Sequence, residues 1–172
     1  MKTKILYLLI CSLSMYLSCC SILFPDEKLS MQRKNYTGNE LRMDGYYYCQ
    51  EKNSTSCIFP YRNGIILSAG GYSTLDLDVV EKEIVDNYAN FGKDKWDWGV
   101  FIITNNQIEY EKWTVPTESI STRKSTGTIE NDTTFHITEQ YFSYNNKKYS
   151  VDEVWHFKQF DNKPDSTNNY IK

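Results

Sequence analysis

The strongest constraint on the fold of this chain is a series of short aromatic and β-branched segments separated by turns. The turns Asn105-Asn106, Asn131-Asp132 and Asn145-Asn146, and a break at Pro116, separate the segments WDWGVFIIT, QIEYEKWTV, ISTRKSTGTIE, TTFHITEQYFSY and KKYSVDEVWHFKQF. Asn and Asp are residues that tight hairpin turns favour. Strands joined in this way pair with their sequence neighbours, so the pattern predicts an antiparallel meander.

The first half of the chain carries the same kind of signal. The segment LRMDGYYYCQ combines the turn residues Asp44 and Gly45 with a run of tyrosines, and CIFPYRNGIILSAGGY returns as one or two strands. The chain holds 14 Tyr, 8 Phe and 4 Trp against 4 Pro, a composition that favours strands over disorder. We therefore expect a mainly β protein of about seven or eight strands, folded as an up-and-down barrel or a strongly curved sheet.

One segment, at about residues 75–90, has the pattern of an amphipathic helix. Ser73 or Thr74 can cap it, and its apolar residues repeat at spacings of three and four. These residues are Leu77, Val80, Ile84, Tyr88 and Phe91. We expect this stripe to close one end of the barrel or to lie against the sheet.

The N-terminus has the composition of a signal peptide rather than of a membrane span. Two lysines in MKTK precede the uncharged run ILYLLICSLSMYL, which is 13 residues long, whereas a transmembrane helix needs about 20. The run ends at LSC, with Ser18 before Cys19, and this resembles the lipobox of bacterial lipoproteins. The resemblance implies that Cys19 is diacylated and that residues 1–18 are removed. Cutting one residue later makes Cys20 the alternative acceptor.

The rest of the chain divides into three parts. Residues 19–40 mix charge with Pro25 and Gly38 and lack periodicity, so we expect a tether to the membrane. Residues 41–161 are expected to form the β-barrel domain and residues 162–172 a polar C-terminal tail. Without the signal the chain has 17 basic and 22 acidic residues and no basic patch, which argues against nucleic acid as a partner.

Two cysteines, Cys49 and Cys57, lie in the body of the protein. In an oxidising envelope compartment they can pair across a hairpin as a disulfide, and the alternative is two free thiols in neighbouring strands. Seven intervening residues and no nearby histidine do not make a zinc site.

Four segments resemble a family of small lipoproteins of the Bacteroidota type. They are LRMDGYYYCQ, YRNGIILSAGG, KDKWDWGVFIITNNQIEYEKW and FDNKPDSTNNYIK, in this order over most of residues 41–172. The resemblance implies a lipocalin-like, calycin-type barrel. It also implies a lipoprotein of the cell envelope, anchored to the outer membrane. The family provides no catalytic residues that could be assigned to positions of this chain. Lipocalins carry a Gly-x-Trp motif on the first strand, where this chain has Gly45-Tyr46-Tyr47.

Two short sequences resemble the O-glycosylation motif of such bacteria, and both also suit turn chemistry. They are Asp132-Thr133-Thr134 and Asp165-Ser166-Thr167.

The chain lacks a recognisable catalytic motif. His136 and His156 lie on the more polar faces of their strands, and alternation places Glu139 and Glu153 on the apolar faces of theirs. Two inward carboxylates can do acid–base work, or each can bond an arginine. The sequence has no phosphate-binding loop, nucleophile elbow or metal-spaced cluster. We expect no enzyme activity, no cofactor and no metal.

Two classes of function fit these observations. The first is a lipid-anchored binding module with a small apolar ligand in an aromatic lumen lined by Trp98, Val100, Tyr110 and Trp155. The second is a structural or interaction module of the envelope whose barrel is filled by the same side chains. A lumen cavity of several hundred cubic ångströms would favour the binding module, and a filled lumen would favour the structural module.

Overall fold

The computed structural model describes residues 27–114 and 120–172. The expected signal peptide and both candidate acceptor cysteines, Cys19 and Cys20, lie outside the described residues.

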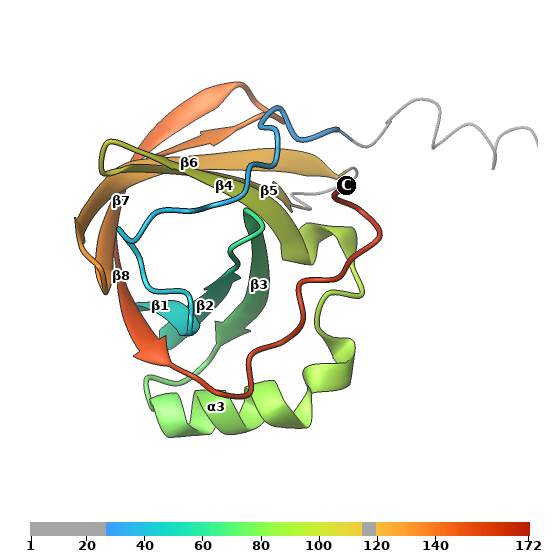
Figure 1. The fold of residues 1–172 in the computed structure, drawn as a ribbon, viewed down its shortest axis with the longest axis vertical. Helices are drawn as coiled ribbons and strands as arrows, with labels where there is room; N and C mark the ends of the chain where they lie inside the picture. Colours follow the sequence, from blue (N-terminus) through green and yellow to red (C-terminus); the bar gives the residue numbers. More distant parts are fainter. Residues whose placement is uncertain (1–26, 115–119) are drawn as a thin grey trace, which may run out of the picture.

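Eight antiparallel strands close into a barrel (Figure 1). Each strand pairs with its sequence neighbours, and β8 closes the barrel by pairing with β1. The strands are β1 (Gly45–Glu51), β2 (Ser54–Pro60), β3 (Ile65–Tyr72), β4 (Trp98–Thr104), β5 (Gln107–Thr114), β6 (Ser121–Asn131), β7 (Thr134–Phe142) and β8 (Lys147–Gln159). The helical segments are α3 (Leu77–Asp86) and two 3-10 turns, η1 (Tyr88–Asn90) and η2 (Lys95–Asp97). The prediction of a mainly β, lipocalin-like barrel with one α-helix is confirmed.

The asparagine turns at residues 105–106 and 145–146 join the strands as expected, whereas the expected turn at 131–132 lies one residue later, because Asn131 still pairs with Thr134. Asn105 and Asn106 have φ values of 49° and 60°, and they connect β4 to β5 between the ladder partners Thr104 and Gln107. Asn146 has a φ of 54° in the turn between β7 and β8. Asparagine enters this left-handed conformation more readily than other side chains, because its short polar group can hydrogen-bond locally.

The helix α3 lies on the outer surface of the barrel, beside β1 to β3 (Figure 1). Asp76 caps its N-terminus, and its side chain accepts a hydrogen bond from Asp78 N at 3.0 Å. Val80 and Ile84 are fully buried against the outward-facing residues of the sheet. Of the two expected positions for the apolar stripe, the helix therefore takes the one against the sheet.

The two faces of the strands build two separate cores. The inner core fills much of the lumen and includes Tyr47, Phe101, Ile108, Ile129, Phe135 and Ile137. The outer core lies between the barrel wall, α3 and the C-terminal segment, and it includes Tyr46, Phe59, Leu67, Val80, Trp98 and Phe160. Because β1 to β4 are covered on both faces, their residues are buried on both faces.

The N-terminal segment, residues 27–44, begins on the outside of β5. Glu27 N donates a hydrogen bond to Ile120 O at 3.1 Å. The carboxylate of Glu111, which is 2% exposed, accepts a hydrogen bond from Met31 N at 2.7 Å. The outer face of β5 is therefore covered by the chain's own N-terminal segment.

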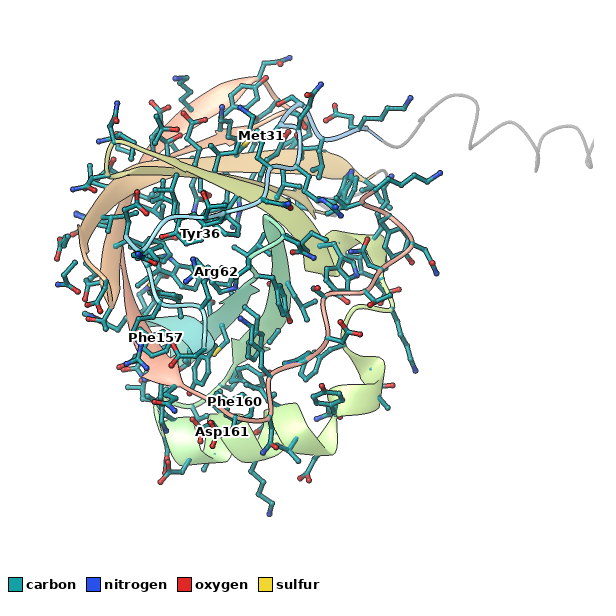
Figure 2. All side chains as sticks on the ribbon, in the orientation of Figure 1. Met31, Tyr36, Arg62, Phe157, Phe160 and Asp161 are labelled. Atoms are coloured by element: carbon teal, nitrogen blue, oxygen red, sulfur yellow. The ribbon has the colours of Figure 1, made fainter. Side chains whose placement is uncertain are left out.

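The same segment then crosses one end of the barrel (Figures 1 and 2). Tyr36 N donates to Arg62 O at 2.8 Å, and the Tyr36 ring lies 5.8 Å from the ring of Phe101. The prediction of a tether over residues 19–40 is wrong for residues 27–40. These residues carry side chains such as Tyr36 that close the end of the lumen, so they belong to the body of the fold.

The C-terminal segment also packs on the body instead of forming a free tail. Lys163 Nζ donates to Met43 O at 2.8 Å and to Pro60 O at 2.5 Å. Phe160 packs in the outer core next to α3 (Figure 2). Lys163 and Phe160 thus attach the start of the C-terminal segment to the body of the fold.

Candidate functional site

The strand ends opposite the bound N-terminal segment surround a cavity of about 360 Å³ in the lumen. This rim is formed where β1 turns into β2, where β3 and β5 end, and where β6 begins. Tyr36 covers the other rim, near the turn between β2 and β3. The cavity lining includes the apolar Ile58 and Trp155 and the polar Tyr110, Lys112, Arg123 and Glu153.

Two neighbouring cross-strand pairs of β5 and β6 form one wall of the cavity. Tyr110 is the ladder partner of Ser125, and Lys112 is the ladder partner of Arg123. Residues two apart on a strand face the same side, so all four side chains point into the barrel. Tyr110, Lys112 and Arg123 line the cavity, and Ser125 is fully buried next to Tyr110.

This wall holds buried polar atoms that lack a hydrogen-bond partner. In the part of the chain that the structure describes, these atoms are Tyr110 Oη, Ser121 Oγ, Arg123 Nε and Ser125 Oγ, all on β5 or β6. Burial raises the pKa of Tyr110 to about 12, and the neighbouring Arg123 and Ser125 oppose this rise. The Ser125 and Tyr110 hydroxyls nonetheless do not meet hydrogen-bond geometry. Buried polar groups are nearly always paired, so this cluster lacks an expected partner.

Lys112 lies in surroundings that disfavour its charged form. Burial, followed by the charge of Arg123, lowers the pKa of Lys112 to about 7, and Asp97 opposes this shift. Within residues 27–114 and 120–172, neither Lys112 nor Arg123 forms an ion pair. The wall therefore presents two neighbouring cationic side chains with no counter-charge in contact.

The opposite wall carries the carboxylate of Glu153 on β8. Gln140 Nε2 donates to Glu153 Oε1 at 2.6 Å, and Trp155 Nε1 donates to Glu153 Oε2 at 3.3 Å. Both carboxylate oxygens thus accept hydrogen bonds from neutral groups on β7 and β8. These bonds hold the carboxylate on its own side of the lumen.

Cys49 and Cys57 are both free thiols. Cys49 is the ladder partner of Ser56, so the next residue, Cys57, faces the other side of β2. Cys49 belongs to the inner core and Cys57 to the outer core. The disulfide alternative is therefore wrong, because the two side chains point away from each other. Burial raises the pKa of each thiol to about 12, which keeps both neutral.

Two of the four residues expected around a lumen cavity line it, and two do not. Tyr110 and Trp155 border the cavity. Trp98 lies in the outer core, and Val100 lines a separate groove on the outside of the barrel. The expectation is wrong for these two because Phe101, not its neighbours, points inward on β4. The first four residues of β4 are all buried, so alternation there does not separate inside from outside.

A β-bulge changes which residues of β7 point inward. The register between β7 and β8 shifts between Ile137 and Glu139, and Gln140 is buried in the barrel in place of Glu139. Glu139 lies outside and pairs with Lys148 at 2.8 Å. The predicted inward position of Glu139 is therefore wrong, whereas Glu153 does face the lumen.

Lys112 and Arg123 are functional candidates that sequence reasoning missed. The alternation of side chains along β5 is the signal that could have identified Lys112. It places Lys112 on the same face of the strand as Tyr110, which was expected to line the lumen. The outer face of β5 holds buried residues as well, Glu111 and Trp113. Without the N-terminal segment that covers them, the two faces of this strand look equally suited to the lumen.

The two histidines lie on the outside of the barrel. His136 Nε2 is 2.7 Å from an Asp152 carboxylate oxygen, and the His156 ring packs 5.8 Å from the ring of Tyr48. In the described ranges, no group of three or more His, Cys, Asp or Glu side chains is arranged to hold a metal ion.

Comparisons of this chain with protein-family models, with curated proteins and with solved structures find no match. Among the described residues, none of the helices has both the length and the apolar character to cross a membrane. The cavity and its lining are therefore the features of this molecule that bear on its function.

Proposed function

We propose that this protein is a binding module that holds one small molecule in the lumen of its barrel. The observation that carries the proposal is the wall of β5 and β6, where Lys112 and Arg123 face a cavity instead of bulk solvent. A purely structural barrel gains no stability from two cations in its interior, because desolvating a charge costs free energy. Perturbed charged groups in a cleft are typical of functional sites.

The size and lining of the cavity favour a small ligand with polar groups. A volume of about 360 Å³ lies at the lower end of the range for ligand sites, about 300–1,000 Å³. Ile58 and Trp155 offer apolar contact, but the lining also carries charged and hydroxyl groups. This mixture supports an amphipathic or polar ligand over the wholly apolar one that the aromatic composition suggests.

We also propose that the protein works in the cell envelope, anchored to the outer membrane by a lipid on Cys19, with Cys20 as the alternative. The support is the short apolar run that ends in Ser18-Cys19. In this proposal the barrel is a small-molecule carrier or sensor held at a membrane surface, with no catalytic step.

Native mass spectrometry of the full chain purified from its own host tests the binding proposal. We expect the wild-type protein to carry an added mass that is lost on unfolding. The variant Ser68→Trp places a large ring in the cavity lining and should lack that mass. The variant Ser150→Trp, at an exposed position of β8, should keep it. Near-UV circular dichroism shows whether each variant is folded.

The proposal fails if the wild-type protein carries no added mass and if no small-molecule extract of the host raises its melting temperature. A structural or interaction module would then be the better description.

A further inference from the structure

We propose that the lumen ligand carries an anionic group, a carboxylate or a phosphate, and that Arg123, Lys112 and Tyr110 bind this group. The inference rests on the proposed binding function and names the chemical class of the ligand. It is carried by the arrangement of charges and of hydrogen-bond donors on β5 and β6.

Two cationic side chains lie side by side in the cavity wall. Lys112 and Arg123 are direct ladder partners and face the same cavity. Like charges that lie directly opposite in a sheet destabilise it. In the described residues no carboxylate lies within ion-pair distance of either side chain. An anion bound between them would remove the repulsion and supply the missing counter-charge.

The unpartnered atoms of this wall include hydrogen-bond donors. Arg123 Nε lacks a hydrogen-bond partner, as does the hydroxyl of Tyr110, which is 1% exposed. Arginine and protonated lysine side chains can only donate hydrogen bonds, and a tyrosine hydroxyl can donate one. The partner that this wall lacks is therefore a group with several acceptor atoms, and a carboxylate or phosphate provides them.

The carboxylate that lines the cavity already has hydrogen-bond partners of its own. Glu153 accepts hydrogen bonds from Gln140 and Trp155 on the opposite wall. These two neutral donors hold the carboxylate without help from Arg123. The cations of β5 and β6 are thus available to bind a ligand. The negative charge of Glu153 would repel a second negative group on the far side of the cavity.

The cavity also limits the size of the ligand. Its volume of about 360 Å³ corresponds to roughly twelve water molecules in the liquid. This space suits a small organic acid or phosphate monoester, whose apolar part can contact Ile58 and Trp155. A long-chain lipid does not fit wholly within it.

The test is isothermal titration of the full chain with four probes that share one ring: benzoate, phenyl phosphate, benzyl alcohol and benzylamine. We expect the two anions to bind and the neutral and cationic probes not to bind detectably. Comparison of benzoate with phenyl phosphate then shows whether the site prefers a carboxylate or a phosphate.

Variants of the wall assign the binding to named residues. Arg123→Gln and Lys112→Met should each weaken anion binding about ten- to hundredfold, as expected for the loss of a charge-assisted hydrogen bond. The matched control is Lys124→Gln on the same strand, because Lys124 lies outside the barrel and pairs with Glu109 at 2.6 Å. This control should leave the affinity unchanged. In the absence of ligand, Lys112→Met should also melt at a higher temperature than the wild type.

The outcomes separate this inference from the binding function. If the molecule retained from the host is neutral or cationic, or if both wall variants bind the anions as tightly as the wild type does, the anion inference is overturned and the binding function stands. If the wild-type protein retains no molecule and binds neither the probes nor any component of the host extract, both are overturned.

Discussion

Gln140 on β7 donates a hydrogen bond of 2.6 Å to Glu153 on β8, inside the barrel. This bond exists because the β-bulge after Ile137 turns Gln140, and not Glu139, toward the lumen. The bulge thus supplies the neutral donor that holds the carboxylate of the cavity in place. Bulges often re-aim side chains next to functional sites in this way.

Replacing Gln140 by Leu should destabilise the protein by about 1–3 kcal/mol, because Glu153 Oε1 loses its donor inside the barrel. Urea denaturation followed by tryptophan fluorescence measures this change. The control is Glu139→Gln, which removes an exposed ion pair with Lys148 and should change the free energy of unfolding by less than about 1 kcal/mol. Equal effects of the two substitutions would contradict the assignment of Gln140 to the lumen.

The pKa of Lys112, lowered to about 7 by burial and by Arg123, gives stability a defined pH dependence. The ordinary pKa of lysine is about 10.4, so between about pH 7 and pH 10 the unfolded chain binds more protons at this residue than the folded chain. The contribution of Lys112 to stability therefore rises with pH across this window. Lys112→Met should be more stable than the wild type at pH 6 to 7, and this difference should shrink as the pH approaches 10.

Other groups titrate in the same window, so the measurement is the difference between the two proteins. Lys163, whose pKa burial lowers to about 8, and the two thiols, whose pKa values burial raises to about 12, contribute equally to both proteins. Near Lys112 in the cavity, Tyr110 stays protonated up to about pH 12, because burial raises its pKa to about that value. A difference that does not vary with pH would show that Lys112 keeps its ordinary pKa.

The protonation of Lys112 should also control the affinity of the protein for an anionic ligand. Lys112 is protonated below about pH 7, so the affinity of the wild-type protein for benzoate should fall as the pH rises through neutrality. Bound anion favours the protonated lysine, which moves the midpoint to a higher pH than in the free protein. In Lys112→Met the affinity should vary little over this range, as calorimetry at several pH values would show.

The buried carboxylate of Glu111 should be essential for attaching the N-terminal segment. Glu111→Ala removes the acceptor for Met31 N and for Ser30 Oγ, and should cost about 1–3 kcal/mol. Amide exchange near Met31 should accelerate, while the strands keep their protection. Glu109→Ala, which removes the half-exposed partner of Lys124, serves as the matched control. Unchanged exchange near Met31 in Glu111→Ala would contradict the contact.

Substitution of Cys19 tests the proposed anchor. Cys19→Ala should abolish labelling by a fatty-acid analogue and release the protein from the membrane fraction, because the acceptor thiol is lost. Cys20→Ala should leave labelling intact. The reverse result would identify Cys20 as the acceptor, and absence of label on the wild-type protein would exclude a lipid anchor.

The sequence predicts the barrel well because its turns are local. Asn105-Asn106 and Asn145-Asn146 define hairpins without help from distant residues. The orientation of side chains in the barrel is harder to predict, because it depends on contacts between segments far apart in the chain. Trp98 faces outward into the outer core, where its Nε1 donates to Gly92 O at 2.8 Å in the segment that follows α3.

The residues of the candidate site are hard to predict for the same reason, because their orientation depends on distant segments. Lys112 follows the alternation of its strand, but only the N-terminal segment over Glu111 shows that the other face is the outside. A β-bulge interrupts the alternation of side chains before Glu139, and no residue type in TTFHITEQYF indicates that a bulge lies there. Tyr110 and Trp155 do line the cavity, as expected from their aromatic side chains, but on β5 this preference does not separate Tyr110 from the outward-facing Trp113.

The hydrogen bond from Glu27 N to Ile120 O places Glu27 at the rim where β6 begins, beside the mouth of the cavity. From Cys19 to Glu27 there are only eight peptide units, which reach at most about 28 Å when fully extended. A lipid on Cys19 would thus keep the cavity mouth within about one bilayer thickness of the membrane surface. Ligand exchange would then take place in the layer of solution next to the lipid headgroups, where the local concentration of anions depends on the charge of the membrane.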